Sequence, residues 1–329
     1  MNEDALIGRI AHALRAVAPG KVLLGIGDDA AVWQPSRSNR SVVTTDALVE
    51  DVHFARALMS AEDVGHRALA ANLSDLAAMG ARPVLATVAL GFPPETDPEW
   101  VVAMYDGIAA LARRARCAIA GGDLTRAPAI TVAITAIGEV RASNLKTRAG
   151  ARPGDVVAVT GPLGASAAGL AAARAGAHVA AAPDVSPAVA AFRRPEPRLR
   201  EGRWLAASRS VRAMMDLSDG LSTDLARLCA ASAAGAVLDG IPVHDAAVAV
   251  AARTGGDPQA WALGGGEDFE LLVAVRRHAF GHLAARFRAH TGRALLPVGR
   301  IVGEPGVRRA DGSPVGPSGW DHLRSSATE

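Results

Sequence analysis

The sequence predicts an α/β protein built from two lobes of about 150 residues each. Helical and strand-like patterns alternate along the whole chain. The chain has 329 residues, of which 50% are hydrophobic and 21% charged, enough for two domains with buried cores. A glycine- and proline-rich segment, RAGARPGD at 148–155, interrupts the alternation near the middle. We therefore expect an N-terminal domain over 1–147 and a C-terminal domain over 148–329.

The first half contains three helical patterns and four strand patterns. Ser60 is a suitable N-cap for the second helix, with acidic residues in its first turn and Gly80 at its end. Pro98 fits the first turn of the third helix. Runs of β-branched residues indicate the strands. We expect helices at 5–17, 61–80 and 97–115, and strands at 21–24, 41–49, 82–92 and 129–140.

The second half repeats this mixture. Apolar runs bounded by glycine or charged residues predict strands at 156–161, 211–217 and 269–275. Helical spacing predicts helices after Gly164, at 220–232 and at 278–290. The turn GPLGASAAGL at 161–170 leads into the first of these helices, and its N–H groups could hold an anion or serve packing alone.

Composition and charge exclude several classes of protein. The net charge is +2 and the arginines form no basic run, which argues against a nucleic acid partner. Cys117 and Cys229 stand alone, so neither a zinc site nor a disulfide framework is indicated. The N-terminus does not resemble a signal peptide, and Arg174 interrupts the most apolar stretch, 164–182. We expect a cytoplasmic protein that does not bind membranes.

Acidic residues recur beside glycines and near strand ends in both halves. A single aspartate of this kind is commonly a turn former or a helix cap. As a set, in a chain of net charge +2, they need a cation, and Mg²⁺ is the hard divalent ion that accompanies phosphates. The set comprises Asp28, Asp29, Asp46, Asp75, Asp123, Asp216, Asp219, Glu267 and Asp268.

The common phosphate-binding motifs do not fit. GIGDDA at 25–30 has the glycine spacing of a dinucleotide loop, but Asp28 and Asp29 would repel a pyrophosphate. PGKVLL at 19–24 lacks the pattern of a Walker loop, and neither G-x-S-x-G nor a kinase H-R-D occurs. Aspartates that hold Mg²⁺, which in turn contacts phosphate, explain the sequence better.

Seven motifs occur along the chain in a characteristic order and spacing. They are GIGDDAAV (25–32), TTDALVEDVHF (44–54), ALAANLSDLAAMGARP (68–83), GGDLTR (121–126), TRAGARPGD (147–155), MDLSDGLSTDL (215–225) and GGGEDFELL (264–272). Together they are highly specific, although none is so alone. In this order and spacing they resemble thiamine-monophosphate kinase, a family in the superfamily of aminoimidazole-ribonucleotide synthetase. The resemblance runs from about residue 24 to GWDHL at 319–323.

The resemblance implies a two-lobed α/β fold and a homodimer in which the N-terminal sheets pair. It implies ATP as co-substrate, thiamine monophosphate as acceptor and several Mg²⁺ ions per site. The implied metal ligands are Asp29, Thr44, Thr45, Asp46, Asp75, Asp123, Asp216 and Asp219, of which Asp46, Asp123 and Asp219 are the catalytic residues. The implied ATP contacts are Tyr105, Gly122, Asp123, Arg148 and Ser218, and the implied substrate contacts are His53, Glu267 and Trp320.

Three positions depart from the family pattern. Leu124 replaces the first threonine of a usual GGDTT, and Asp51 stands where glycine is common. Trp320 replaces a usual tyrosine or phenylalanine. None of the three removes a carboxylate, so we expect the activity to be intact.

Two alternatives stay open at this stage. Within the superfamily, the chain could be a synthetase such as aminoimidazole-ribonucleotide synthetase, or a hydrogenase-maturation or selenophosphate enzyme. The last two use a reactive cysteine near a terminus, where this chain has none. From another class, a non-catalytic protein that binds divalent cations or nucleotides would also explain the carboxylates.

Overall fold

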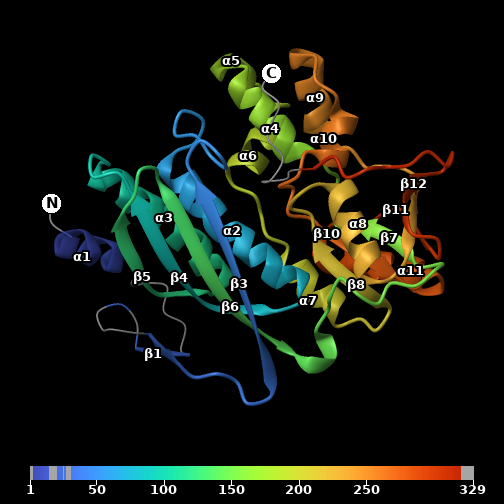
Figure 1. Cartoon of the computed structure of the whole chain (residues 1–329), viewed down its shortest axis with the longest axis horizontal. Coiled ribbons are helices and arrows are strands. Elements are labelled where there is room, and N and C mark those ends of the chain that lie inside the picture. The colour runs from blue at the N-terminus through green and yellow to red at the C-terminus, as the bar shows by residue number, and fades with distance from the viewer. Residues whose placement is uncertain (1–2, 15–20, 25, 27–30, 320–329) are drawn as a thin grey trace. The chain divides into compact units, whose positions relative to one another are not determined.

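The computed structural model describes residues 3–14, 21–24, 26 and 31–319, which form two compact units. Unit 1 takes in Met1–Leu145 and Arg193–Ala207, and unit 2 takes in Lys146–Phe192 and Ser208–Glu329. Each unit has its own sheet, as Figure 1 shows. No sequence pattern indicated that Arg193–Ala207 packs with the first half of the chain.

Unit 1 is built on a four-stranded sheet of order β3-β6-β4-β5. β4 and β5 run parallel, and the other neighbours are antiparallel. A separate antiparallel pair, β1 and β2, packs near one end of this sheet. The strands are β1 (Val22–Leu24), β2 (Val32–Trp33), β3 (Asn39–Val49), β4 (Arg82–Phe92), β5 (Ala118–Arg126) and β6 (Thr131–Arg141). The helices are α1 (Glu3–Leu14), α2 (Ala61–Ala78), α3 (Pro98–Ala115), α7 (Leu199–Ala206) and a short 3₁₀ turn (Ala142–Asn144).

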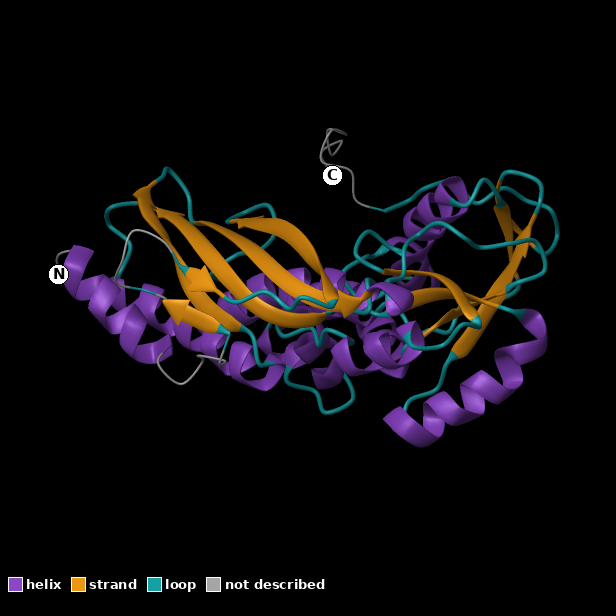
Figure 2. Ribbon diagram, turned by 90° about the horizontal axis from the view of Figure 1, so that it is seen from below, coloured by secondary structure: helices purple, strands orange, loops and turns teal. Residues whose placement is uncertain are grey.

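Two capped helices cover one side of the unit 1 sheet, as Figure 2 shows. Ser60 and Asp63 form a capping box, with the Asp63 N–H donating to the Ser60 hydroxyl at 3.2 Å. α3 begins at Pro98. α2 and α3 can approach closely because Gly65 has no side chain. A Cβ added to Gly65 would lie 1.9 Å from the Met104 carbonyl oxygen. The same local signals that predicted these helices therefore also fix their starts.

Unit 2 is built on a six-stranded sheet of order β12-β9-β11-β7-β10-β8. Only the pairing of β12 with β9 is parallel among these neighbours. The strands are β7 (Val156–Val159), β8 (Val211–Asp216), β9 (Gly235–Leu238), β10 (Leu271–Val275), β11 (Leu296–Val302) and β12 (Gly306–Arg309). The helices are α4 (Ala165–Arg174), α5 (Ala177–Ala180), α6 (Ser186–Arg193), α8 (Leu221–Ala231), α9 (Asp245–Thr254), α10 (Pro258–Gly264) and α11 (Arg277–Thr291).

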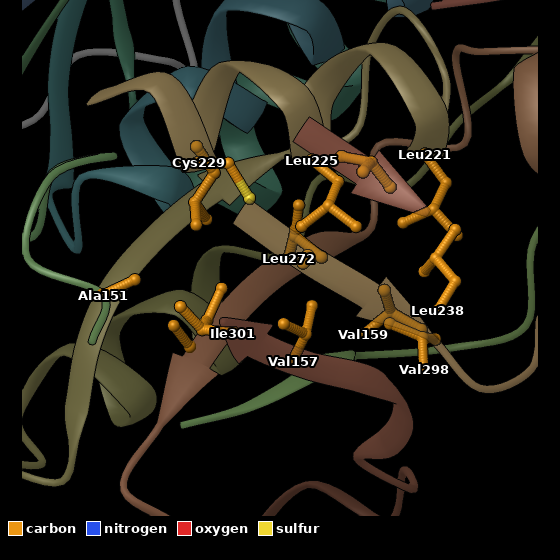
Figure 3. Packing of buried hydrophobic residues seen from close by; sticks show 14 of the residues in the cluster. Ala151, Val157, Val159, Leu221, Leu225, Cys229, Leu238, Leu272, Val298 and Ile301 are labelled. Carbon is orange, nitrogen blue, oxygen red and sulfur yellow. The ribbon is translucent and has the colours of Figure 1, made fainter. Parts of the chain in front are cut away.

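The core of unit 2 lies between its sheet and α8. Figure 3 shows Leu225 and Cys229 of α8 beside Leu272 of strand β10, which pairs with β7 and β8. Cys117 and Cys229 are both buried, as expected of small apolar side chains. Burial raises the pKa of the Cys117 thiol to about 12 and that of Cys229 to about 11. Both thiols are therefore inert at neutral pH.

The predicted α/β class is confirmed, and each helix and strand expected from the sequence has a counterpart in the structure. One local expectation was wrong at two positions, because these acidic residues were expected near strand ends. Asp46 lies inside β3, which is paired with β6 along its whole length to Val49. Asp123 lies inside β5. In the described ranges no helix is long and apolar enough to cross a bilayer.

Candidate active site

Strand β3 and helix α2 bring predicted metal ligands together in unit 1. The Thr44 hydroxyl donates a hydrogen bond to the Asp75 carboxylate. Strand alternation puts Asp46 on the same face of the sheet as Thr44, the face toward α2. Thr45 lies on the opposite face, where its hydroxyl donates to the Ile134 carbonyl at 3.1 Å. Thr44, Asp46 and Asp75 thus form an oxygen-rich cluster, and Thr45 is separate from it.

Asp123 and Gly122 lie on β5, at the other edge of the same sheet. Gly122 shares a register row with Asp46, through Val88 and Ile134 on the two strands between them. Three strand spacings separate the row's ends by roughly 14 Å. Alternation turns Asp123 toward the face opposite Asp46. Within one chain, these two aspartates therefore cannot share a metal ion, whose ligand distances are about 2 Å.

A turn after β3 positions His53. The Val49 N–H donates to Nδ1 of His53 at 3.1 Å, and the His53 N–H donates to the Val49 carbonyl at 2.9 Å. Nδ1 is the acceptor, so the ring proton of neutral His53 is on Nε2. Asp51 has a φ of 62°, a left-handed conformation that glycine adopts without strain. This conformation explains why glycine is common at that position, and aspartate is among the residues that tolerate it.

Tyr105 lies on α3 and is buried, only 3% exposed. Burial raises the pKa of its phenol, so the group stays neutral. Arg148 is exposed in the segment before β7, where its carbonyl accepts a hydrogen bond from the Ser232 hydroxyl at 3.0 Å. These two of the predicted ATP contacts thus differ in accessibility: Arg148 is exposed, while Tyr105 has little exposed surface.

In unit 2, the buried residue Asp224, which no sequence pattern singled out, organises the loop after β8. Asp216 ends β8 and is buried. The Ser218 and Asp219 N–H groups donate to Oδ2 of Asp224, at 3.1 and 3.0 Å. Burial raises the pKa of Asp224 to about 6. Asp224 therefore fixes the backbone that carries two predicted site residues. Its place in the first turn of α8, soon after DLSDG, is a signal that could have identified it.

Arg227 supplies the positive charge beside this loop. Its guanidinium forms an ion pair with Asp219 and another with Asp224, at 3.0 Å in the second case. The predicted metal ligand Asp219 thus has a cationic partner within its own chain.

The glycine-rich loop before β10 places Glu267 against the same segment. The Glu267 N–H donates to the Ser218 carbonyl at 2.7 Å. Gly266 has a φ of 69°, and a Cβ there would lie 2.6 Å from the Ser218 carbonyl oxygen. Close backbone approach therefore requires glycine at 266. The fold brings together Ser218 and Glu267, which are 49 positions apart in the sequence.

The backbone N–H groups of the turn at 161–170 bind a side chain of the protein itself, that of Asp268. The Gly164 and Ser166 N–H groups donate to the Asp268 carboxylate, at 2.8 and 3.3 Å. Burial raises the pKa of Asp268 to about 7, and the hydrogen bonds from this turn counteract that effect. The N-terminus of α4 is therefore already occupied by a side chain.

Two predicted site residues, Asp29 and Trp320, lie outside the described residues. Within the part of the chain that the structure describes, no three histidine, cysteine or acidic side chains converge into a metal site. The candidate site residues lie in two groups: the Thr44, Asp46 and Asp75 cluster of unit 1, and the Ser218, Asp219 and Glu267 loops of unit 2.

Comparisons with known proteins match both halves. Residues 27–140 match the AIR synthase related protein N-terminal domain, and residues 152–311 match the corresponding C-terminal domain. A thiamine-monophosphate kinase of Mycobacterium tuberculosis is 36% identical over 324 residues, covering 97% of this chain and 91% of the relative. The chain belongs to the thiamine-monophosphate kinase family.

Solved structures of the family have the same fold. The thiamine-monophosphate kinase of Stenotrophomonas maltophilia K279a is 36% identical, with a TM-score of 0.84 over 95% of this chain and 98% of that one. AaThiL complexed with AMPPCP and TMP is 29% identical, with a TM-score of 0.79 over 98% of this chain and 97% of that one. The predicted family and enzyme class, a kinase, are confirmed.

Proposed function

We propose that this chain transfers the γ-phosphoryl group of ATP to thiamine monophosphate, giving thiamine diphosphate. The AaThiL complex with AMPPCP and TMP supports both substrates, since AMPPCP stands in for ATP with a bridge that resists cleavage. The observation in this structure that carries the proposal is the cluster of Thr44, Asp46 and Asp75 on one face of the unit 1 sheet.

The donor atoms of this cluster suit Mg²⁺. They are carboxylate and hydroxyl oxygens, the ligands that this ion prefers, and no thiol or imidazole stands among them. We propose that Asp29, Thr44, Thr45, Asp46, Asp75, Asp123, Asp216 and Asp219 hold several Mg²⁺ ions. When bound, these ions would neutralise phosphate charge. Because Asp46 and Asp123 are roughly 14 Å apart across the sheet, they would serve different ions within one chain.

The chain's own task in this reaction is to position two polyanions. The acceptor is a phosphate oxygen that is already ionised near neutral pH, so the reaction needs no general base. Direct in-line transfer then depends on orientation and on screening the repulsion between the substrates. Arg148, exposed before β7, would contact ATP phosphates, as would the backbone around Gly122 and Ser218.

We propose that His53, Glu267 and Trp320 contact thiamine monophosphate. The Val49 N–H donates to Nδ1 of His53, so Nε2 is the nitrogen that carries the ring proton in neutral His53. Glu267 is a carboxylate that would face a cationic thiazolium ring. Trp320 would offer that ring an aromatic face.

We also propose a homodimer in which the unit 1 sheets pair, and a cytoplasmic location. The face of the sheet opposite α2 carries Val43, which is 63% exposed, together with the exposed residues Thr45 and Ala47. An exposed apolar side chain on a regular sheet face fits contact with a second copy.

One assay tests the proposed function. ATP consumption is followed with thiamine monophosphate, with thiamine and with no acceptor, and the product is identified by mass. We expect thiamine diphosphate from the monophosphate alone, since the hydroxyl of thiamine would need a base. Equal rates with thiamine would contradict this mechanism. ATP binding without turnover would favour a non-catalytic binding protein, and another phosphorylated product would favour a synthetase of the superfamily.

A further inference from the structure

The Asp268 carboxylate is bound at the start of α4. Its Oδ2 accepts the Gly164 N–H at 2.8 Å, and its Oδ1 accepts the Ser166 N–H at 3.3 Å. Both donors belong to the first turn of α4 or its N-cap, where backbone N–H groups have no partner within the helix. Asp268 is thus anchored to an element about a hundred positions away in the sequence.

The backbone on both sides of this anchor is held in an unusual conformation. Glu267 has a φ of 57° and Phe269 a φ of 48°, both in the left-handed region that side chains disfavour. Such residues persist when surrounding contacts over-determine them, and they cluster at functional sites. The Asp268 carboxylate, between the two, supplies a contact of this kind.

Backbone hydrogen bonds tie this segment to the loop after β8. The Glu267 N–H donates to the Ser218 carbonyl at 2.7 Å, and the Phe269 N–H donates to the Leu217 carbonyl at 3.0 Å. In return, the Leu217 N–H donates to the carbonyl of Glu270 at 2.8 Å. The anchor at α4, the strained segment and the loop that carries Ser218 therefore form one connected assembly within unit 2.

We propose that Asp268 is a positioning residue, which fixes the backbone of Glu267 and so the place of the Glu267 carboxylate against thiamine monophosphate. This inference rests on the proposed function. A change of φ at Glu267 from the left-handed to the ordinary helical region redirects its Cβ. The Glu267 carboxylate would then leave its place even though its own chemistry is unchanged.

A purely structural role for Asp268 makes a different prediction. As a simple cap of α4, it would contribute stability without influencing substrate binding. A positioning role links Asp268 to one substrate and not to the other. The KM values of thiamine monophosphate and ATP, measured beside stability, separate the two roles.

The experiment uses Asp268→Asn in the full-length chain. Asparagine keeps the volume, but its amide NH₂ would face an N–H donor of α4. We expect kcat/KM for thiamine monophosphate to fall on the order of tenfold, about 1.4 kcal/mol, with the KM for ATP within about twofold of wild type. Asp268→Glu, which keeps the charge but lengthens the side chain, is the second variant if the first does not fold, and we expect the same split.

A double mutant sharpens the test. If Asp268 acts through Glu267, then Asp268→Asn adds little to the loss already caused by Glu267→Gln, because both changes disrupt one contact. Asp155→Asn is the matched control. Asp155 is a buried carboxylate of the same unit that accepts the Arg152 N–H at 2.9 Å at the start of β7. We expect this control to lower stability and leave both KM values unchanged.

The proposal would be overturned by an Asp268 variant that loses stability but keeps kcat/KM for thiamine monophosphate within about twofold of wild type, a ratio worth only about 0.4 kcal/mol. Fully additive losses in the double mutant would also overturn it. A wild-type enzyme that does not phosphorylate thiamine monophosphate would instead refute the proposed function, an outcome visible before any variant is made.

Discussion

Replacing Glu139 by glutamine should destabilise unit 1. Glu139 lies on β6, and only 4% of the residue is exposed. Its carboxylate accepts hydrogen bonds from Lys21 Nζ at 2.6 and 2.7 Å and from the Ser36 N–H at 2.9 Å. Arg82 adds a further contact at 3.3 Å. Glutamine preserves the shape but removes the charge that these donors share.

The size of the effect follows from the pKa of Glu139. Burial alone raises this pKa, but hydrogen bonds from Lys21 and Ser36 outweigh burial and lower it from 4.5 to about 2. At about 1.36 kcal/mol for each pH unit, the interval corresponds to about 3 kcal/mol in the free energy of unfolding. This value is of the size expected for a few hydrogen bonds to a charged group.

The pH dependence has a definite sign. A carboxylate whose pKa is lowered by folding stabilises the folded state above its unfolded pKa, here 4.5. This contribution is lost as the pH falls through about 2. The difference in stability between wild type and Glu139→Gln should therefore be full at neutral pH and less than half as large near pH 3.

Urea unfolding of both proteins, at about pH 7 and about pH 3, measures this difference. Glu99→Gln is the matched control, because Glu99 also pairs with an arginine, Arg9, but on the surface. Surface ion pairs contribute little, so the control should behave like wild type. A loss below about 1 kcal/mol for Glu139→Gln at neutral pH, or a loss that does not depend on pH, would refute the reasoning.

Four further predictions follow from the site and the packing. Asp46→Asn and Asp123→Asn should each lower kcat more than tenfold, about 1.4 kcal/mol, without unfolding the protein, and a smaller loss contradicts their assignment. Trp320→Ala should raise the KM for thiamine monophosphate about 5- to 30-fold in steady-state kinetics and leave the KM for ATP unchanged. Light scattering should report roughly twice the chain mass of 33.6 kDa, and a monomer at all concentrations argues against the dimer. Gly107→Ala should cost roughly 1–3 kcal/mol in urea unfolding, because its Cβ would lie 2.0 Å from a backbone oxygen of α2, whereas Gly8→Ala has room and serves as control.

Local chemistry made several features predictable from the sequence. Ser60 and Asp63 indicate where α2 begins, and Pro98 indicates where α3 begins, because a helix cap depends on residues within one turn. The motif residues of the family were recognisable for a similar reason: each motif is a short run of residues whose order does not depend on the fold.

Contacts between distant segments were decided only by the tertiary structure. The opposite faces of Asp46 and Asp123 follow from the register of β3, β6, β4 and β5, which pairs residues as far apart in the sequence as Asn39 and Arg141. The aspartates that anchor the unit 2 loops differ in the same way. Asp224 lies near the loop that it holds, but Asp268 binds the start of α4, which precedes it by about a third of the chain. Sequence patterns report a residue's type and local period, whereas hydrogen bonds across a fold depend on distances that exist only after the chain has packed.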